Sequence, residues 1–217
     1  MIIVVGGVKG GSGKTTIATN LAVLRSESGK KVLLVDADEQ RSTSTFANQR
    51  DVLGIETKWS TIQLAGKTVN SQVLRLKPNY DDIIIDAGGR DTTSQRSALT
   101  VADIYLVPFK PRSYDVWTIG DVKTIIREMR VANPKLQAYA FINQADPKGS
   151  DNNEALSIIE ECDEFKCLPI TIGNRKTFGN SSSDGLGVTE VKKQDTKAVQ
   201  EMRSLYEILY NNCTHSI

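Results

Sequence analysis

The stretch that decides the fold reads Lys9-Gly10-Gly11-Ser12-Gly13-Lys14-Thr15-Thr16. A short β-branched run, Ile2 to Val5, precedes it and is typical of a buried strand, and a helical pattern follows it from Lys14 to about Ser28. Strand, glycine-rich loop and helix in this order are the context in which a phosphate-binding loop works. Glycines let successive backbone N–H groups converge on an anion, and the helix N-terminus adds partial positive charge. The sequence therefore predicts a phosphate site at this loop.

The side chains of the loop divide by chemical role. Lys14 is placed to reach the β- and γ-phosphates of a nucleotide, the Thr15 hydroxyl to ligate Mg²⁺, and Thr16 to donate to the α-phosphate. The backbone that would surround the phosphates belongs to Gly10, Gly11, Ser12 and Gly13. Val8 stands where the strict phosphate-loop pattern has glycine, but the core from Gly13 to Thr15 is complete. A glycine-rich turn that only caps a helix is the less favoured alternative.

The rest of the chain alternates apolar strands with helical patterns. Further runs typical of strands occupy Val32–Val35, Ile83–Ile85, Ile104–Val107 and Tyr139–Ile142. Helical patterns fill roughly 68–77, 92–101, 115–132, 151–162 and 194–211. Because the strands are continuously apolar, both faces of their sheet must be covered. The sequence predicts an α/β fold, with a mainly parallel central sheet and helices on both faces, as one domain over residues 1–217. Residues 41–66 receive no clear assignment.

Composition removes several classes of protein. The 217 residues carry 27 basic and 26 acidic side chains, so a strongly basic nucleic-acid binder is disfavoured while local basic patches stay open. One histidine, His215, argues against a Ser-His-Asp triad or a multi-histidine metal site. The cysteines are sparse, form no CxxC pair and fit reduced thiols of a cytoplasmic protein: Cys162, Cys167 and Cys213. No apolar run approaches the ~20 residues of a membrane helix.

Carboxylates stand at the ends of two predicted strands. The strand from Val32 leads to Asp36, with Asp38 two residues later, and the strand from Ile83 leads to Asp86. Ligands of open α/β sheets bind at the carboxyl ends of strands, beside the phosphate loop. Asp86 is therefore predicted to act on the metal through water. The Gly88-Gly89 pair after it predicts a flexible loop near the γ-phosphate.

A second lysine, Lys9, gives the loop a specific resemblance. With it the loop is similar to the deviant Walker A motif of the ParA/MinD family of ATPases. The run from Asp36 to Gln40 resembles the family's Asp-x-Asp-Pro-Gln switch I pattern, with Glu39 in place of the proline, and the glycine pair after Asp86 resembles small ParA proteins. The resemblance extends over essentially the full chain. It implies ATP and Mg²⁺ as cofactors and slow ATP hydrolysis as the activity.

The resemblance also implies roles for single residues. Lys9 would cross a dimer interface and touch the other subunit's nucleotide, forming the catalytic set with Lys14 and Asp38. Asp38 would position or polarise the attacking water, and Asp36 would support Mg²⁺ through water beside Thr15 and Asp86. Asn143, at the end of the last predicted strand, would hydrogen-bond the adenine. The plainer alternatives stay open: a solvated lysine, an ordinary loop acid and a polar strand cap.

Later segments continue the resemblance. The run from Leu168 to Phe178 is similar to the family's late Ile-x-x-Arg segment, and Ser113 would cap the helix after a proline-rich loop. Basic residues here and in the last helix are predicted to contact DNA phosphates: Arg175, Lys176 and Arg203, with Lys192, Lys193 and Lys197 as further candidates. Each of them could instead be an ordinary solvated surface charge.

The resemblance implies a small partition or positioning ATPase, without the N-terminal DNA-binding extension of larger ParA proteins. Its ATP–Mg²⁺ sandwich dimer would bind DNA without sequence specificity, in the cytoplasm on the nucleoid and not on a membrane. A ParB-like or cargo-adaptor partner would stimulate hydrolysis and release.

Other classes of protein are alternatives to this one. A MinD-like membrane ATPase would need a basic amphipathic C-terminal helix, whereas residues 200–210 mix acids with bases. An iron–sulfur carrier would need a differently spaced cysteine pair, and a small-molecule kinase or ligase stays open. The cargo, and whether the ATP form polymerises, are not specified.

Overall fold

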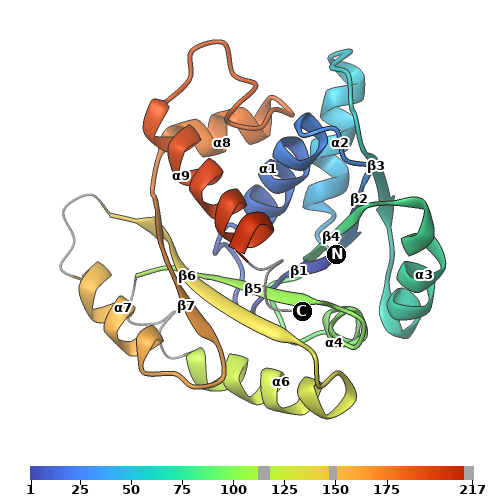
Figure 1. The fold of residues 1–217 in the computed structure, drawn as a ribbon. Coiled ribbons are helices and arrows are strands. Elements are labelled where there is room, and N and C mark those ends of the chain that lie inside the picture. The colour runs from blue at the N-terminus through green and yellow to red at the C-terminus, as the bar shows by residue number, and fades with distance from the viewer. Residues whose placement is uncertain (112–117, 147–150, 213–217) are drawn as a thin grey trace.

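A single parallel sheet organises the chain (Figure 1). The computed structural model describes residues 1–111, 118–146 and 151–212. Within them the strand order is β3-β2-β4-β1-β5-β6-β7, and every neighbouring pair is parallel. The strands are β1 (Ile2–Val5), β2 (Val32–Ala37), β3 (Ser60–Gln63), β4 (Asp82–Ala87), β5 (Ile104–Phe109), β6 (Gln137–Ala145) and β7 (Lys166–Gly173). The predicted α/β fold is confirmed.

Helices cover both faces of the sheet, as Figure 1 shows. One face carries α1 (Lys14–Glu27), α2 (Ser42–Val52), α8 (Lys176–Ser183) and α9 (Thr196–Glu207). The other carries α3 (Val69–Leu76), α4 (Thr93–Leu99), α6 (Ile119–Ala132) and α7 (Asp151–Glu160). Short turns complete the order: η1 (Gly66–Thr68), η2 (Lys77–Asn79) and η3 (Ile208–Asn212). Successive side chains of β1 alternate between the two cores, which is why the strand is apolar throughout.

The five predicted strands are present, β1 at its predicted bounds and the others somewhat longer. The predicted helices are also found, with α6 described from Ile119 onward; Ser113 and the start predicted at 115 lie outside the described residues, as do Cys213 and His215. Among the described helices, none combines the length and apolarity needed to cross a bilayer.

The sequence does not predict four of the α-helices and strands in the described ranges: α2, β3, β7 and α8. Strand β3 is a four-residue edge strand whose side chains are half-buried or exposed, so it carries no apolar run. Helix α2 buries Thr43, Phe46 and Arg50, at helical spacing but with two polar members. Its burial is decided by distant partners, which the local pattern does not reveal.

Candidate functional site

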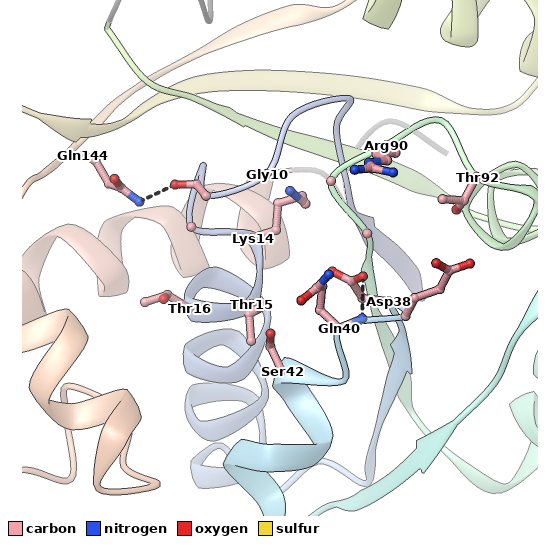
Figure 2. A pocket seen from close by; sticks show the side chains of 15 residues that line it. Gly10, Lys14, Thr15, Thr16, Asp38, Gln40, Ser42, Arg90, Thr92 and Gln144 are labelled. Atoms are coloured by element: carbon pink, nitrogen blue, oxygen red, sulfur yellow. Dashed lines mark hydrogen bonds between the residues drawn. The ribbon is translucent and has the colours of Figure 1, made fainter.

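The loop between β1 and α1 forms one wall of a cavity of about 680 Å³ (Figure 2). The cavity is lined by Gly10, Gly11, Gly13, Lys14, Thr15, Thr16, Asp38, Glu39, Gln40, Ser42, Gly88, Gly89, Arg90, Thr92 and Gln144. Gly13 has φ 87°, and a Cβ added there would lie 2.4 Å from the Asn143 amide nitrogen. Only glycine fits at this start of α1. The structure therefore explains the glycine at position 13, and phosphate binding by this loop stays a prediction.

Lys14 lies folded back over the loop. Its side chain is buried, and Nζ donates to the Lys9 carbonyl at 2.8 Å. Burial lowers the pKa of Lys14, although Asp86 and Asp38 act in the opposite direction and Lys110 adds to the lowering. A carbonyl is a weak partner for a buried ammonium, and a phosphate oxygen would be a stronger one. The lysine is thus placed to exchange the loop carbonyl for a nucleotide phosphate.

Two carboxylates face the loop from neighbouring strands. Asp36 of β2 and Asp86 of β4 are paired in register, and both are fully buried. The Thr15 hydroxyl donates to Asp86 Oδ2 at 2.7 Å, and the Thr43 hydroxyl donates to the same oxygen at 2.7 Å. The other oxygen, Oδ1, is buried and accepts no hydrogen bond from any described residue. An orphaned carboxylate oxygen beside a threonine hydroxyl is the kind of position from which a metal-bound water is held.

These residues fit a Mg²⁺ ion that comes with a nucleotide. Among the described residues, no group of three or more His, Cys, Asp or Glu side chains could form a metal site alone. Mg²⁺ with nucleotides uses one or two carboxylates, phosphate oxygens and waters, and does not need an all-protein cage. Thr15, Asp36 and Asp86 supply such a set. Their roles toward the metal stay predictions.

Asp86 predicts a measurable pH dependence of stability in metal-free protein. Burial raises its pKa from 3.8 to about 7, against the hydrogen bonds from Thr15 and Thr43. When folding raises the pKa of an acid, the folded state loses stability as the pH rises from the pKa of the unfolded state toward the pKa of the folded state. In EDTA we expect the free energy of unfolding to fall by roughly 4 kcal/mol between about pH 4 and pH 7 through this group, then to level. Urea titrations across this pH range should show that the free energy of unfolding falls less in Asp86→Asn than in the wild type. An equal fall in both proteins would contradict the raised pKa of Asp86.

Helix α2 is fastened to both carboxylates at its first turn. Thr43 holds Asp86, and Ser44 donates from its backbone N and its hydroxyl to Asp36 Oδ2, at 2.7 and 2.6 Å. Neither residue was singled out from the sequence. The available signal was the polar run from Arg41 to Thr45 following a strand that ends in acids. The two hydroxyls tie Asp36 and Asp86 to the segment that carries Asp38.

The loop around Asp38 is shaped without the family's proline. The Gln40 backbone N donates to Asp38 Oδ1 at 3.0 Å, and the Arg41 backbone N donates to the Asp38 carbonyl at 3.1 Å. Arg41 takes a left-handed conformation, φ 54°, before α2 begins. Glu39 is exposed and leaves this turn intact. The Asp38 carboxylate lies over Gly88, where an added Cβ would be 3.0 Å from Oδ1. The predicted catalytic carboxylate therefore faces the cavity.

The glycine pair after β4 permits close approach. A Cβ on Gly89 would lie 2.6 Å from both Cα and N of Gly10, so this segment packs directly on the phosphate loop. Beyond it, Thr92 caps α4 by accepting from the Gln95 backbone N at 3.1 Å. Gln95 in turn accepts from the Gly7 backbone N at 3.0 Å. We call residues 88–92 the switch II loop; it is tied to the phosphate loop at both ends.

A second cavity, of about 490 Å³, lies on the other side of Gly13. It is lined by Gly13, Thr16, Ile17, Asn143, Gln144, Gly173, Asn174, Arg175, Lys176, Phe178 and Gly179. Asn143 is buried, and its amide donates to the Ser12 carbonyl at 2.7 Å. It therefore braces the phosphate loop, and the adenine contact predicted for it stays a prediction. Cavity volume and position suit the nucleoside end of a nucleotide.

The predicted DNA contacts divide between two settings. Arg175 lines this second cavity and forms an ion pair with Glu201 of α9, with Nη2 2.6 Å from Oε1. Lys176 is exposed at the start of α8, and Arg203 is exposed on α9, as are Lys192, Lys193 and Lys197 before and on that helix. Arg175 is thus engaged within the protein, whereas the others face outward. Contact with DNA stays a prediction for all of them.

Comparison with known proteins decides the family. The domain described as "CobQ/CobB/MinD/ParA nucleotide binding domain" matches residues 3–188, which include the whole of both cavities. The chain belongs to this family. Within the CobQ/CobB/MinD/ParA family, the maintenance of carboxysome distribution protein A of Halothiobacillus neapolitanus is 26% identical over 94% of this chain and 93% of that protein. The protein ParA of Rhizobium radiobacter is 32% identical over 65% of this chain and 63% of its own length.

Solved structures agree with the fold. An aspartate-to-alanine variant of McdA from Cyanothece, in complex with ATP, superposes with a TM-score of 0.81 at 17% identity, covering 96% of this chain and 95% of that one. The cell division ATPase MinD of Pyrococcus furiosus gives a TM-score of 0.77 at 18% identity, with coverage of 97% and 98%. Family members are ATPases, among them the chromosome-partitioning ATPase Soj of Thermus thermophilus, 26% identical over 62% of this chain and 65% of its own length. The predicted ATPase activity and P-loop fold are confirmed at the level of the family.

Proposed function

We propose that this chain is a ParA-type positioning ATPase whose ATP–Mg²⁺ form is a dimer that binds DNA without sequence specificity. One observation carries the proposal: Lys14, Thr15 and Asp38 converge on one cavity, with Asp86 behind them. Curated relatives named for carboxysome distribution and for chromosome partitioning support the positioning role. Such a protein would act in the cytoplasm on the nucleoid.

The residues would act as follows. N–H groups of Gly10 to Gly13 surround the phosphates, and Lys14 exchanges the Lys9 carbonyl for phosphate oxygens. Thr15, with Asp36 and Asp86 through water, would hold Mg²⁺, which supplies neutralising charge to the phosphates. Asp38, aimed into the cavity over Gly88, orients the attacking water and accepts its proton.

DNA contact is assigned to the exposed basic residues of α8, α9 and the segment between them. Two modest patches in a dimer would bind with avidity and with strong salt dependence, which reconciles DNA binding with a net charge of +1. Helix α9 buries Ala198, Met202 and Leu205 against the core. Its apolar side therefore packs on the protein, as a docking helix does, and gives no support to a lipid-bound role. A ParB-like or cargo-adaptor protein is proposed to stimulate hydrolysis and release.

Lys9→Ala is expected to spare ATP binding and to abolish hydrolysis in the dimer. Lys9 is half-buried and precedes the exposed Gly10 of the loop, a position from which its side chain is proposed to reach across to a partner's nucleotide. Light scattering with ATP–Mg²⁺ and with ADP–Mg²⁺ measures the molar mass and so the fraction of dimer. Phosphate release measures the rate of ATP hydrolysis. Lys77→Ala, at an exposed position in η2, is the matched control. A chain that stays monomeric with ATP would contradict the proposed function, and normal turnover in Lys9→Ala would remove the role of Lys9.

A further inference from the structure

Arg90 lies in the switch II loop at the rim of the phosphate cavity. The residue is exposed and lines the same cavity as Lys14 and Asp38, as Figure 2 shows. Its position is fixed by its neighbour, because Gly89 packs so closely on Gly10 that a Cβ would lie 2.6 Å from the Gly10 backbone. Consecutive Cα atoms are about 3.8 Å apart. Arg90 therefore follows directly after the residue that packs on the Gly10 backbone, at the predicted phosphate site.

No acidic residue in the described part of the chain forms an ion pair with Arg90. The adjacent acid, Asp91, is held by Arg96, whose Nε and Nη2 lie 2.6 Å from its two oxygens; Glu128 takes the remaining Arg96 nitrogen, also at 2.6 Å. Arg90 makes no hydrogen bond or ion pair with any residue in the three described ranges. Arg96, on α4, is thus fully paired, whereas Arg90, in the switch II loop, lines the phosphate cavity without a partner among the described residues.

The surroundings of Arg90 favour an anion with several oxygens. Lys14 and the backbone of Gly10, Gly11 and Gly13 line the same cavity, so an anion held by them would lie beside Arg90. Asp38 and Glu39 also line this cavity, and no ion pair joins either of these two described carboxylates to Arg90. A guanidinium binds two phosphate oxygens at once through its planar pair of N–H donors. Phosphate is therefore the ligand chemistry that fits.

The position along the nucleotide follows from the two cavities. The cavity around Asn143 and Thr16 suits the nucleoside end, on the far side of Gly13. Gly88 and Asp38 mark the opposite end, where water would attack, and Arg90 follows two residues after Gly88. We propose that Arg90 contacts the terminal phosphate of ATP, so that the switch II loop distinguishes ATP from ADP. This inference rests on the proposed function, because it requires nucleotide at this site.

Equilibrium binding tests the inference without relying on turnover. Wild type, Arg90→Gln, Arg90→Lys and the control Arg75→Gln, at an exposed position of α3, are titrated with ATPγS–Mg²⁺ and ADP–Mg²⁺ against a fluorescent nucleotide. A charge-assisted hydrogen bond lost on one ligand only predicts about 10- to 100-fold weaker ATPγS binding by Arg90→Gln, with ADP affinity within about 2-fold of wild type. The ATPγS affinity of Arg90→Lys should lie between those of the wild type and Arg90→Gln, because lysine keeps the positive charge but loses the paired N–H donors of the guanidinium. Arg75→Gln should match wild type.

Each other outcome has a definite meaning. Unchanged ATPγS affinity in Arg90→Gln, or equal loss for both nucleotides, overturns the terminal-phosphate contact while leaving the ATPase assignment intact. A loss seen only at protein concentrations where dimers form assigns Arg90 to the interface between subunits and also overturns it. Failure of the wild type to bind either nucleotide would remove the proposed function and this inference together.

Discussion

Asp38→Ala is expected to slow ATP hydrolysis by about 10²- to 10⁴-fold and to leave nucleotide binding intact. Asp38 is half-buried, lies against Gly88 and has one oxygen held by the Gln40 backbone N at 3.0 Å. That hydrogen bond aims the carboxylate into the cavity, where an attacking water would give up its proton. Among the described residues that line the cavity, Glu39 is the other carboxylate, and it is exposed on the turn.

The matched variant is Asp38→Asn, which keeps the shape and the acceptor for Gln40 but not the base. It should be nearly as slow as the alanine variant if proton acceptance is what Asp38 supplies. Phosphate release under single-turnover conditions, alongside nucleotide affinity, makes the measurement. We also expect the alanine variant to accumulate as an ATP-bound dimer. Hydrolysis within a few-fold of wild type, or a variant that stays monomeric with ATP–Mg²⁺, would contradict the role.

Arg50→Ala is expected to lower the free energy of unfolding by about 3 to 5 kcal/mol, although Arg50 lies outside the nucleotide cavity. Its guanidinium is fully buried and forms a two-pronged ion pair with Glu190, at 2.7 and 2.9 Å. It also donates to the carbonyls of Gly185 and Glu56, both at 2.8 Å, and stacks 4.6 Å from the Trp59 ring centre. Removing Arg50 takes one donor away from each of these acceptors and opens a cavity, although Glu190 Oε2 still accepts from the Gly187 backbone N at 2.8 Å.

Urea unfolding monitored by tryptophan fluorescence measures this loss. Glu190→Gln should cost less, because that side chain is 21% exposed and the amide still accepts a hydrogen bond. Arg75→Ala, at an exposed position of α3, should stay within about 0.5 kcal/mol of wild type. A loss below about 1 kcal/mol for Arg50→Ala would show that α2 is held mainly by Phe46 and its first-turn hydroxyls.

The phosphate loop and the acids could be predicted because their signals are local. Glycine spacing, Lys14-Thr15 and strand ends at Asp36 and Asp86 lie within short stretches, and the strand-end rule places them together. Helix α2 gave no such signal. Two of its buried residues, Thr43 and Arg50, are polar, and their partners Asp86 and Glu190 lie 43 and 140 residues away along the chain. Only the assembled fold shows that they belong inside.

The same limit applies to Arg90 and Arg96. In sequence they are two arginines of one polar stretch, and nothing local separates the one that Asp91 and Glu128 neutralise from the one that faces the cavity. Gly88 and Gly89 were predicted to make the loop flexible, and that stays a prediction; the structure shows in addition that they permit contact with Asp38 and Gly10. Both distinctions depend on tertiary contacts.

Binding to a random-sequence DNA duplex at low salt, with ATP–Mg²⁺ and ADP–Mg²⁺ in parallel, tests the central claim most directly. An ATP-driven dimer that joins two basic patches predicts tight binding with ATP, little with ADP, and a steep loss of affinity as salt rises. Substituting Lys192, Lys193 and Lys197 together should then reduce the salt slope without changing ATP affinity. Absence of DNA binding with either nucleotide, in protein that dimerises normally with ATP, would contradict the DNA-bound positioning role.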